Sequence, residues 1–332
     1  MIPVPTVRRP LFPAFIAALL AGGAVAGAGP AAAAWPDDRP IEILVGYQAG
    51  SGPDLLARRI APVIAKHLGG KANFVVNNRT GASSEIAWSA LARAEPNGYT
   101  LAVLITPSFI TVDFIRKPQY DASAIMPLAR IVDDPALMVA SGKSPYNSLT
   151  EVIAKLKATP ESVSIGNNGI GTNGYLATLA LEQAAGVSVN IIPFKGSSES
   201  RTALLGGHLD VAVQSVSEHA LDKEAVGLFK PLAQFGAERT KILHEVPTAK
   251  ELGIEGYVSS ERGLAVPRGT PPAIVERLQK AIAAAVEDPD FYLNTSRDEL
   301  QVSYLPGSEW AKSMQERKVR YGEIMKKAPP RN

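Results

Sequence analysis

The strongest constraint on the fold of this chain is a regular alternation of short apolar segments with helical segments. Strand-like runs recur at 41–45, 72–76, 99–105, 128–132, 136–140, 162–166, 189–194, 210–214 and 257–267. Helical patterns lie between most of them, near 53–68, 83–94, 148–158, 173–185, 197–206 and 270–288. Strands that are separated by helices pair in parallel and carry helices on both faces of the sheet. The sequence therefore predicts an α/β fold with mostly parallel sheet.

The length of the chain, 332 residues, is sufficient for two compact lobes, each with its own core. No internal repeat occurs, and no low-complexity linker occurs beyond the first 34 residues. Two sheets would therefore be joined by short crossings rather than by a flexible tether.

The charge balance argues against nucleic acid as a partner. The chain has 34 basic and 32 acidic residues, a net charge of +2, and the leader 1–34 contributes two arginines and no acid, which leaves +2 − 2 = 0 for the rest. Such a chain has no basic excess with which to displace counterions from phosphates. The absence of cysteine excludes thiolate metal sites and cysteine nucleophiles, and it fits an exported protein without disulfides.

Residues 1–34 have the pattern of a signal peptide. Arg8 and Arg9 precede an apolar stretch, and the stretch ends in four alanines before Trp35. The alternative is a membrane anchor, but the apolar stretch is rich in glycine and contains Pro13 and Pro30. The prediction is export to the periplasm with cleavage near residue 34.

A glycine-rich turn, GYQAGSGPD at 46–54, connects the first predicted strand to the first predicted helix. Unpaired N–H groups at a helix N-terminus attract anions, and glycine lets a ligand approach the backbone closely. We expect the amides of Gly50, Ser51 and Gly52 to bind a carboxylate, because no lysine follows to hold a phosphate. We expect Asp54 to tie the loop together rather than to contact ligand.

Several other functional classes fit poorly. The turn lacks the third glycine of the dinucleotide-binding fingerprint and the Gly-Lys-Ser/Thr of a P-loop. No Gly-x-Ser-x-Gly or His-Glu-x-x-His motif occurs, and the pair His208 and Asp210 is more typical of a structural role than of a metal site. We expect no cofactor, no metal and no catalysis, with an exported α/β enzyme as the weaker alternative.

Seven motifs in register resemble those of the Bug-type periplasmic receptors, the substrate-binding proteins of tripartite tricarboxylate transporters. The resemblance runs from about Trp35 to the C-terminus. The motifs are GYQAGSGPD at 46–54, NRTGASS at 78–84, NGYTL at 97–101, GIGTNGY at 169–175, FKG at 194–196 with LLGGHLD at 204–210, VPT at 246–248 and PRGTP at 267–271.

The resemblance implies a type II periplasmic-binding-protein fold, in which a ligand is held between two lobes. Domain one would comprise 36–138 and 260–332, domain two would comprise 139–259, and the chain would cross between them near 138 and 259. The implied function is to capture a small organic carboxylate, either a dicarboxylic or an aromatic acid, as a monomer and deliver it to a membrane permease of one large and one small subunit. A carboxylate sensor that acts on a signalling partner is the alternative.

The same resemblance, together with the turn chemistry, suggests the ligand-binding residues. Domain one would contribute Tyr47, Gln48, Gly50, Ser51, Gly52, Ser83, Ser84, Thr106, Ser108 and Arg262. Domain two would contribute Gly171, Thr172, Asn173, Lys195 and Gln214, with Gly196 and Ser197 in the same turn as Lys195.

Five of these positions bear on specificity or have an alternative structural role. Ser83 and Ser84 replace glycines and either bind ligand oxygens or only cap a helix. Gln214 stands where some relatives have an acid, and its neutral amide favours a plain carboxylic acid over an amine-bearing one. Arg262 either holds a second carboxylate of the ligand or forms a surface ion pair with Glu261 or Glu255. Lys195 either faces the ligand or only shapes its turn.

Overall fold

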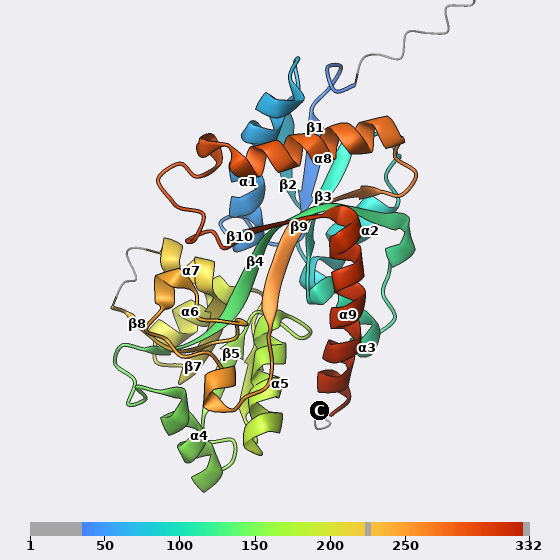
Figure 1. Ribbon diagram of the computed structural model, residues 1–332. Helices are drawn as coiled ribbons and strands as arrows, with labels where there is room; N and C mark the ends of the chain where they lie inside the picture. Colours follow the sequence, from blue (N-terminus) through green and yellow to red (C-terminus); the bar gives the residue numbers. More distant parts are fainter. Residues whose placement is uncertain (1–34, 223–226, 328–332) are drawn as a thin grey trace, which may run out of the picture. The chain divides into compact units, whose positions relative to one another are not determined.

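The structure is a computed structural model, and it describes residues 35–222 and 227–327 (Figure 1). The predicted signal peptide, 1–34, lies outside the described residues. Within the described part of the chain, no helix is both long enough and apolar enough to cross a membrane.

Ten strands and nine α-helices are described, and they alternate along most of the chain. The strands are β1 (Ile41–Val45), β2 (Phe74–Asn78), β3 (Thr100–Ile105), β4 (Ile125–Ser141), β5 (Ser164–Asn167), β6 (Asn190–Pro193), β7 (Val211–Ser215), β8 (Phe229–Gln234), β9 (Ser259–Pro267) and β10 (Val302–Pro306). The helices are α1 (Gly52–Leu68), α2 (Glu85–Ala92), α3 (Ser108–Ile115), α4 (Leu149–Ala158), α5 (Asn173–Ala185), α6 (Ser197–Leu205), α7 (Val216–Leu221), α8 (Pro272–Glu287) and α9 (Gly307–Lys326). The predicted α/β class is confirmed.

The strands form two half-sheets that share β4. Strand β1 pairs in parallel with β2 and β3, and β3 continues through antiparallel β9 to β4 and β10; we call this group the first half-sheet. Strands β5, β6 and β7 pair in parallel, and β7 and β8 pair antiparallel with the end of β4; we call this group the second half-sheet. The predicted crossings near 138 and 259 fall in β4 and at the start of β9.

Strand β4 is longer than expected, because 128–132 and 136–140 belong to one strand of 17 residues rather than to two. Its pairing with β9 shifts between Pro127 and Ala129 and again between Arg130 and Val132. Such irregularities let a strand bend and tolerate a proline that cannot donate to the ladder. The bent strand thus passes from one half-sheet into the other.

The core is built from apolar side chains of the strands and from one face of the long helices. Ile41, Ile43 and Val45 of β1 are fully buried. On α8, Leu278, Ile282 and Val286 recur at every fourth position and are buried, while α1 packs against the same helix. Burying a side chain of this size stabilises the fold by roughly 1.5–3 kcal/mol.

A buried ion network fastens β9, β4 and α9 together where the half-sheets meet. Glu261 of β9 is 0% exposed and accepts from Arg130 Nη1 of β4 at 2.5 Å, while Arg317 Nη2 of α9 lies 3.2 Å away. The other oxygen of Glu261 accepts from Thr106 Oγ1 at 2.9 Å and Trp310 Nε1 at 3.2 Å. The network holds β9 firmly, and the next residue on that strand faces the cleft described below.

One pH-dependent contact joins α1 to the turn after α8. Bonds from Lys66 at 2.8 Å, Asp290 N at 3.0 Å and His67 at 2.7 Å lower the pKa of Asp288 to about 2. Because this value lies below the usual unfolded value of about 3.9, the stabilisation is present above pH ~4 and is lost as the pH falls toward ~2. We expect Asp288→Asn to reduce the acid dependence of unfolding within that window, measured by urea denaturation at successive pH values. Lys66→Met should have a similar effect, and unchanged curves for both variants would contradict the assignment.

Candidate ligand-binding site

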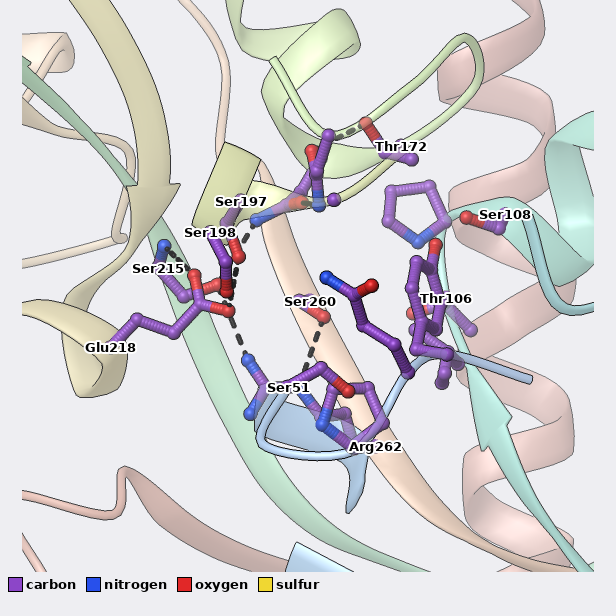
Figure 2. Close-up of a pocket in the computed structure, with 18 residues that line it drawn as sticks. Ser51, Thr106, Ser108, Thr172, Ser197, Ser198, Ser215, Glu218, Ser260 and Arg262 are labelled. Atoms are coloured by element: carbon purple, nitrogen blue, oxygen red, sulfur yellow. Dashed lines mark hydrogen bonds between the residues drawn. The ribbon is translucent and has the colours of Figure 1, made fainter. Parts of the chain in front are cut away.

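A narrow pocket lies between the two half-sheets, at the carboxyl ends of β1, β3, β5 and β7 (Figure 2). We call it the central pocket, and its enclosed volume is ≈ 30 Å³. Open α/β sheets bind their ligands at this edge, where successive loops converge. The lining residues are Tyr47, Gln48, Ser51, Pro53, Ile105, Thr106, Pro107, Ser108, Asn168, Thr172, Asn173, Gly196, Ser197, Ser198, Ser215, Glu218, Ser260 and Arg262.

Two larger cavities adjoin the central pocket and share residues with it. The first, the side cavity, has a volume of ≈ 280 Å³. Its lining includes Gly50, Ser51, Gly52, Glu218 and Arg262, leucines of α1, α7 and the 300 region, and the charged residues Arg59, Arg201 and Asp222. The second, of ≈ 330 Å³, is lined by Tyr47 and Gln48 together with Ser83 and Lys195. A ligand larger than a few atoms therefore either extends into these cavities or requires the half-sheets to separate.

We predicted that three amides of the first loop bind an anion, and for two of them this prediction is wrong. Gly50 N–H donates to Asp54 Oδ2 at 2.9 Å, and Ser51 N–H donates to Gln48 O at 3.2 Å. The loop thus satisfies these groups itself and does not offer them to a ligand.

Asp54 ties this loop together, as predicted. It is 1% exposed, and besides Gly50 it accepts from Asn78 Nδ2 at 2.8 Å and Arg58 Nε at 3.0 Å. Burial alone would raise the pKa of Asp54, but the bonds from Arg58, Gly50 and Asn78 outweigh it and lower the pKa below its usual range.

The structure brings most of the predicted residues to the cleft. Those that line the central pocket are Tyr47, Gln48, Ser51, Thr106, Ser108, Thr172, Asn173 and Arg262. Gly50 and Gly52 line the side cavity, and Ser83 and Lys195 line the other one. The Lys195 side chain is exposed there, and its backbone N–H donates to Glu199.

Ser84 and Gly171 are used differently from the prediction. Ser84 is fully buried against Gly46, where an added Cβ would lie only 2.3 Å from Ser84 Cα, so its hydroxyl packs behind the loop. Gly171 has φ +79°, and its carbonyl accepts from Thr111 Oγ1 at 2.7 Å. It therefore joins α3 to the second half-sheet instead of facing the central pocket.

Gln214 points away from the cleft. Successive side chains of a strand project to opposite faces, and it is Ser215 of β7 that faces the central pocket. Gln214 is 2% exposed, and its Nε2 lies 3.3 Å from Nδ1 of His219. The prediction that Gln214 contacts ligand is wrong, because it is the neighbouring Ser215 that faces the pocket. The argument that Gln214 favours a ligand without an amine therefore no longer holds.

Arg262 is buried and faces the cleft. It is 4% exposed, and its Nη2 contacts Asp134 Oδ2 at 2.5 Å. Longer bonds of 3.3 Å run from Nη2 to Ser215 Oγ and from Nε to Ser260 Oγ (Figure 2). The alternative of a surface ion pair with Glu261 or Glu255 is wrong, because β9 turns this side chain inward onto β4.

Asp134, the partner of Arg262, is itself 0% exposed. Burial raises the pKa of its carboxyl, and contact with Arg262 and the hydroxyl and N–H of Ser217 opposes that effect. Direct contact with a guanidinium favours the charged form, so we treat the two groups as an ion pair at neutral pH.

Glu218 is the charged residue of the pocket that the sequence analysis missed. Its Oε1 accepts from Ser197 Oγ at 2.7 Å and its Oε2 from Ser215 N at 2.9 Å. Ser215 and Glu218 form a capping box at the start of α7, so the Ser-x-x-Glu spacing after an apolar strand was the available signal. Asn168, Ser198 and Ser260 were also missed.

Most hydroxyls of the pocket already have partners. Thr172 Oγ1 bonds to Asn168 Oδ1 at 2.7 Å, and Thr106 Oγ1 donates to Glu261 at 2.9 Å. Burial raises the pKa of Tyr47, so its hydroxyl stays protonated at neutral pH. Ser51 Oγ is buried and has no partner among the described residues, which leaves it available to a ligand.

The comparisons with known proteins agree with this geometry. A model of the tripartite tricarboxylate transporter family receptor, TctC, matches residues 56–329. This chain belongs to the TctC family. The chain is 32% identical over 278 residues to a Cupriavidus necator protein encoded in the gbd 5′ region, covering 82% of each sequence. Protein BugT of Bordetella pertussis is 30% identical over 253 residues, which cover 75% of this chain and 77% of BugT.

Solved structures share the fold of this chain. A TctC solute-binding protein from Polaromonas superimposes with a TM-score of 0.69 at 33% identity, covering 89% of this chain and 100% of that one. Rhodopseudomonas palustris Rpa4515, solved with adipate, superimposes with a TM-score of 0.79 at 26% identity, covering 88% of this chain and 97% of that one. MatC from the same organism, solved with malate, has a TM-score of 0.76 at 26% identity, covering 87% of this chain and 99% of MatC. The predicted periplasmic-binding-protein fold is confirmed.

Proposed function

We propose that this TctC-family receptor is a periplasmic solute-binding protein that captures a small organic carboxylate in the central pocket and delivers it to a tripartite tricarboxylate-type permease. The observation that carries the proposal is the pocket itself: a narrow, hydroxyl-rich space between two half-sheets, with Arg262 in its wall. Hydroxyl and guanidinium donors suit carboxylate oxygens. The adipate and malate bound by two relatives support the same class of ligand.

The side cavity can accept the carbon skeleton of such an acid. Leu56 and Leu300, 6% and 7% exposed, line it together with the more exposed Leu55. Charged side chains of Arg59, Arg201 and Asp222 share the lining with these leucines, and a mixture of apolar and convergent polar groups is typical of small-molecule sites. A dicarboxylic or aromatic acid would thus place its polar end in the central pocket and its skeleton beside these leucines.

Family membership and the leader sequence support delivery in the periplasm. We expect residues 1–34 to direct export and to be removed, and the remaining protein to act as a monomer on a large and a small permease subunit. A receptor that reports the same acid to a signalling partner is the alternative. Uptake of the bound acid by cells, compared with and without a deletion of this receptor, separates the two roles.

Ligand binding without turnover is the direct test. A panel of straight-chain and aromatic mono- and dicarboxylates should include an acid that binds one site and raises the melting temperature. At 100 times its dissociation constant such an acid stabilises the protein by about 2.7 kcal/mol. The same acid should be recovered unchanged after prolonged incubation, as measured by NMR. Sustained consumption by the pure protein would overturn the receptor assignment in favour of an enzyme.

A further inference from the structure

We propose that the ligand of the central pocket carries a protonated amine as well as a carboxylate, and that Glu218 binds the amine. The inference rests on the proposed function and names the second polar group of the ligand. The starting observation is that the Glu218 carboxylate lines both the central pocket and the side cavity. A site for purely anionic ligands would not place a negative charge there.

Glu218 is held in place but retains acceptor capacity. The bonds from Ser197 Oγ and Ser215 N each occupy one position on a different oxygen. An ionised carboxylate offers about four such positions. Both donors belong to the second half-sheet side of the cleft, so they fix the carboxylate in the wall and leave capacity for a donor that enters between the half-sheets.

Arg262 forms its ion pair with a carboxylate other than Glu218. No ion pair joins these two side chains among the described residues, and the guanidinium is instead paired with buried Asp134 at 2.5 Å. Both approach Gly52: a Cβ built there would lie 2.9 Å from Arg262 Nη1 and 3.4 Å from Glu218 Oε1. The two charged groups therefore both lie beside the first residue of α1, and both line the central pocket.

Among the described residues Glu218 has no ion-pair partner, whereas the two arginines near it have one. Arg262 pairs with Asp134, and Arg201, which lines the side cavity with Glu218, pairs with Asp222. A dicarboxylate would bring its second negative charge next to this carboxylate, whereas an ammonium group would pair with it.

The carboxylate of the same ligand has its own donors. Ser51 Oγ is unpartnered among the described residues, and Arg262 Nη1 faces the loop that carries it. The pocket thus offers donors for an anion and an acceptor for a cation within one narrow space. This is the polarity of an amino acid or an ω-amino acid.

Calorimetric titration with acids of matched length tests the inference. The probes are pentanoate, 2-aminopentanoate, 5-aminopentanoate and pentanedioate, with their homologues of four to eight carbons. At the chain length that gives the tightest binding, one of the amine-bearing acids should bind at least tenfold more tightly than the acids of that length without an amine. Glu218→Gln should abolish that difference without weakening the other acids. Glutamine retains the capping box, so the variant removes the charge and keeps the fold.

Glu151→Gln is the matched control. Glu151 caps α4 through Asn147 N at 2.7 Å, as Glu218 caps α7, but it lines none of the cavities described above. It should leave every affinity unchanged. Tightest binding of an acid without an amine, unaffected or improved in Glu218→Gln, would overturn the inference and leave the proposed function intact. Failure of the whole panel to bind would overturn both.

Discussion

Replacing Glu261 with alanine is expected to destabilise the protein by about 3–5 kcal/mol, because removing one partner of a buried ion network leaves the others uncompensated. Glu261 is fully buried, and the substitution would leave Arg130 and Arg317 with Asp133 as their remaining acidic partner. Thr106 and Trp310 would also lose their acceptor. For a protein of this size the loss corresponds to a melting temperature lower by roughly 10 °C. Thermal and urea unfolding of the purified variant measure it.

Glu276→Ala provides the matched control. Glu276 lies on the exposed face of α8, where it pairs with Lys280 at 2.6 Å, and its side chain is 65% exposed. An ion pair in full contact with water contributes little to the free energy of unfolding, so this variant should unfold at nearly the wild-type temperature. If Glu261→Ala behaved like Glu276→Ala, the network would not be what holds β9, β4 and α9 together.

Gly52→Val is expected to weaken binding of the best acid about a hundredfold, since charge-assisted bonds contribute roughly 1.5–3 kcal/mol each and tenfold in affinity is about 1.4 kcal/mol. A Cβ at this position would lie 2.9 Å from Nη1 and 3.2 Å from Cζ of Arg262. The guanidinium cannot swing aside without breaking its contacts with Asp134, Ser215 and Ser260. Valine therefore displaces the cation from the wall of the pocket. Calorimetry with the tightest acid of the panel measures the loss.

The control for this variant is Pro272→Val. Like Gly52 in α1, Pro272 is the first residue of its helix, α8, and it is exposed and remote from the cleft. It should bind the acid normally, and both variants should remain folded by circular dichroism. Wild-type affinity in folded Gly52→Val would show that Arg262 is not needed where the structure places it.

The alternation of strands and helices was enough to predict the α/β class, because that pattern reflects burial, which depends on nearby residues. The division of 128–140 into two strands failed for the opposite reason. Asp134 pairs with Arg262, and Asp133 pairs with Arg317 as well as with the nearby Arg130, so each aspartate has a partner more than 100 positions away. Pairing over such distances leaves no local trace in the sequence.

The loops that form the candidate site were predicted, but its acidic residue, Glu218, was not. The loops that follow β1, β3 and β5 were identified from their turn residues, and they do line the pocket. Gln214 was proposed from its place in the family resemblance, whereas the alternation of side chains along β7 makes Ser215 the residue that faces inward. Helix α9 was not predicted, although Trp310, Met314 and Tyr321 are spaced for one buried face.

Strand β4 has a consequence for how the protein can be divided. It pairs with β9 and β10 through its first residues and with β7 and β8 through its last, so neither half-sheet is complete without it. A fragment cut at residue 138 would split this strand and leave unpaired backbone edges on both pieces, which favours aggregation. Chimaeras that exchange one lobe with a relative should therefore carry 125–141 as an intact block, and the two lobes should unfold in a single cooperative transition.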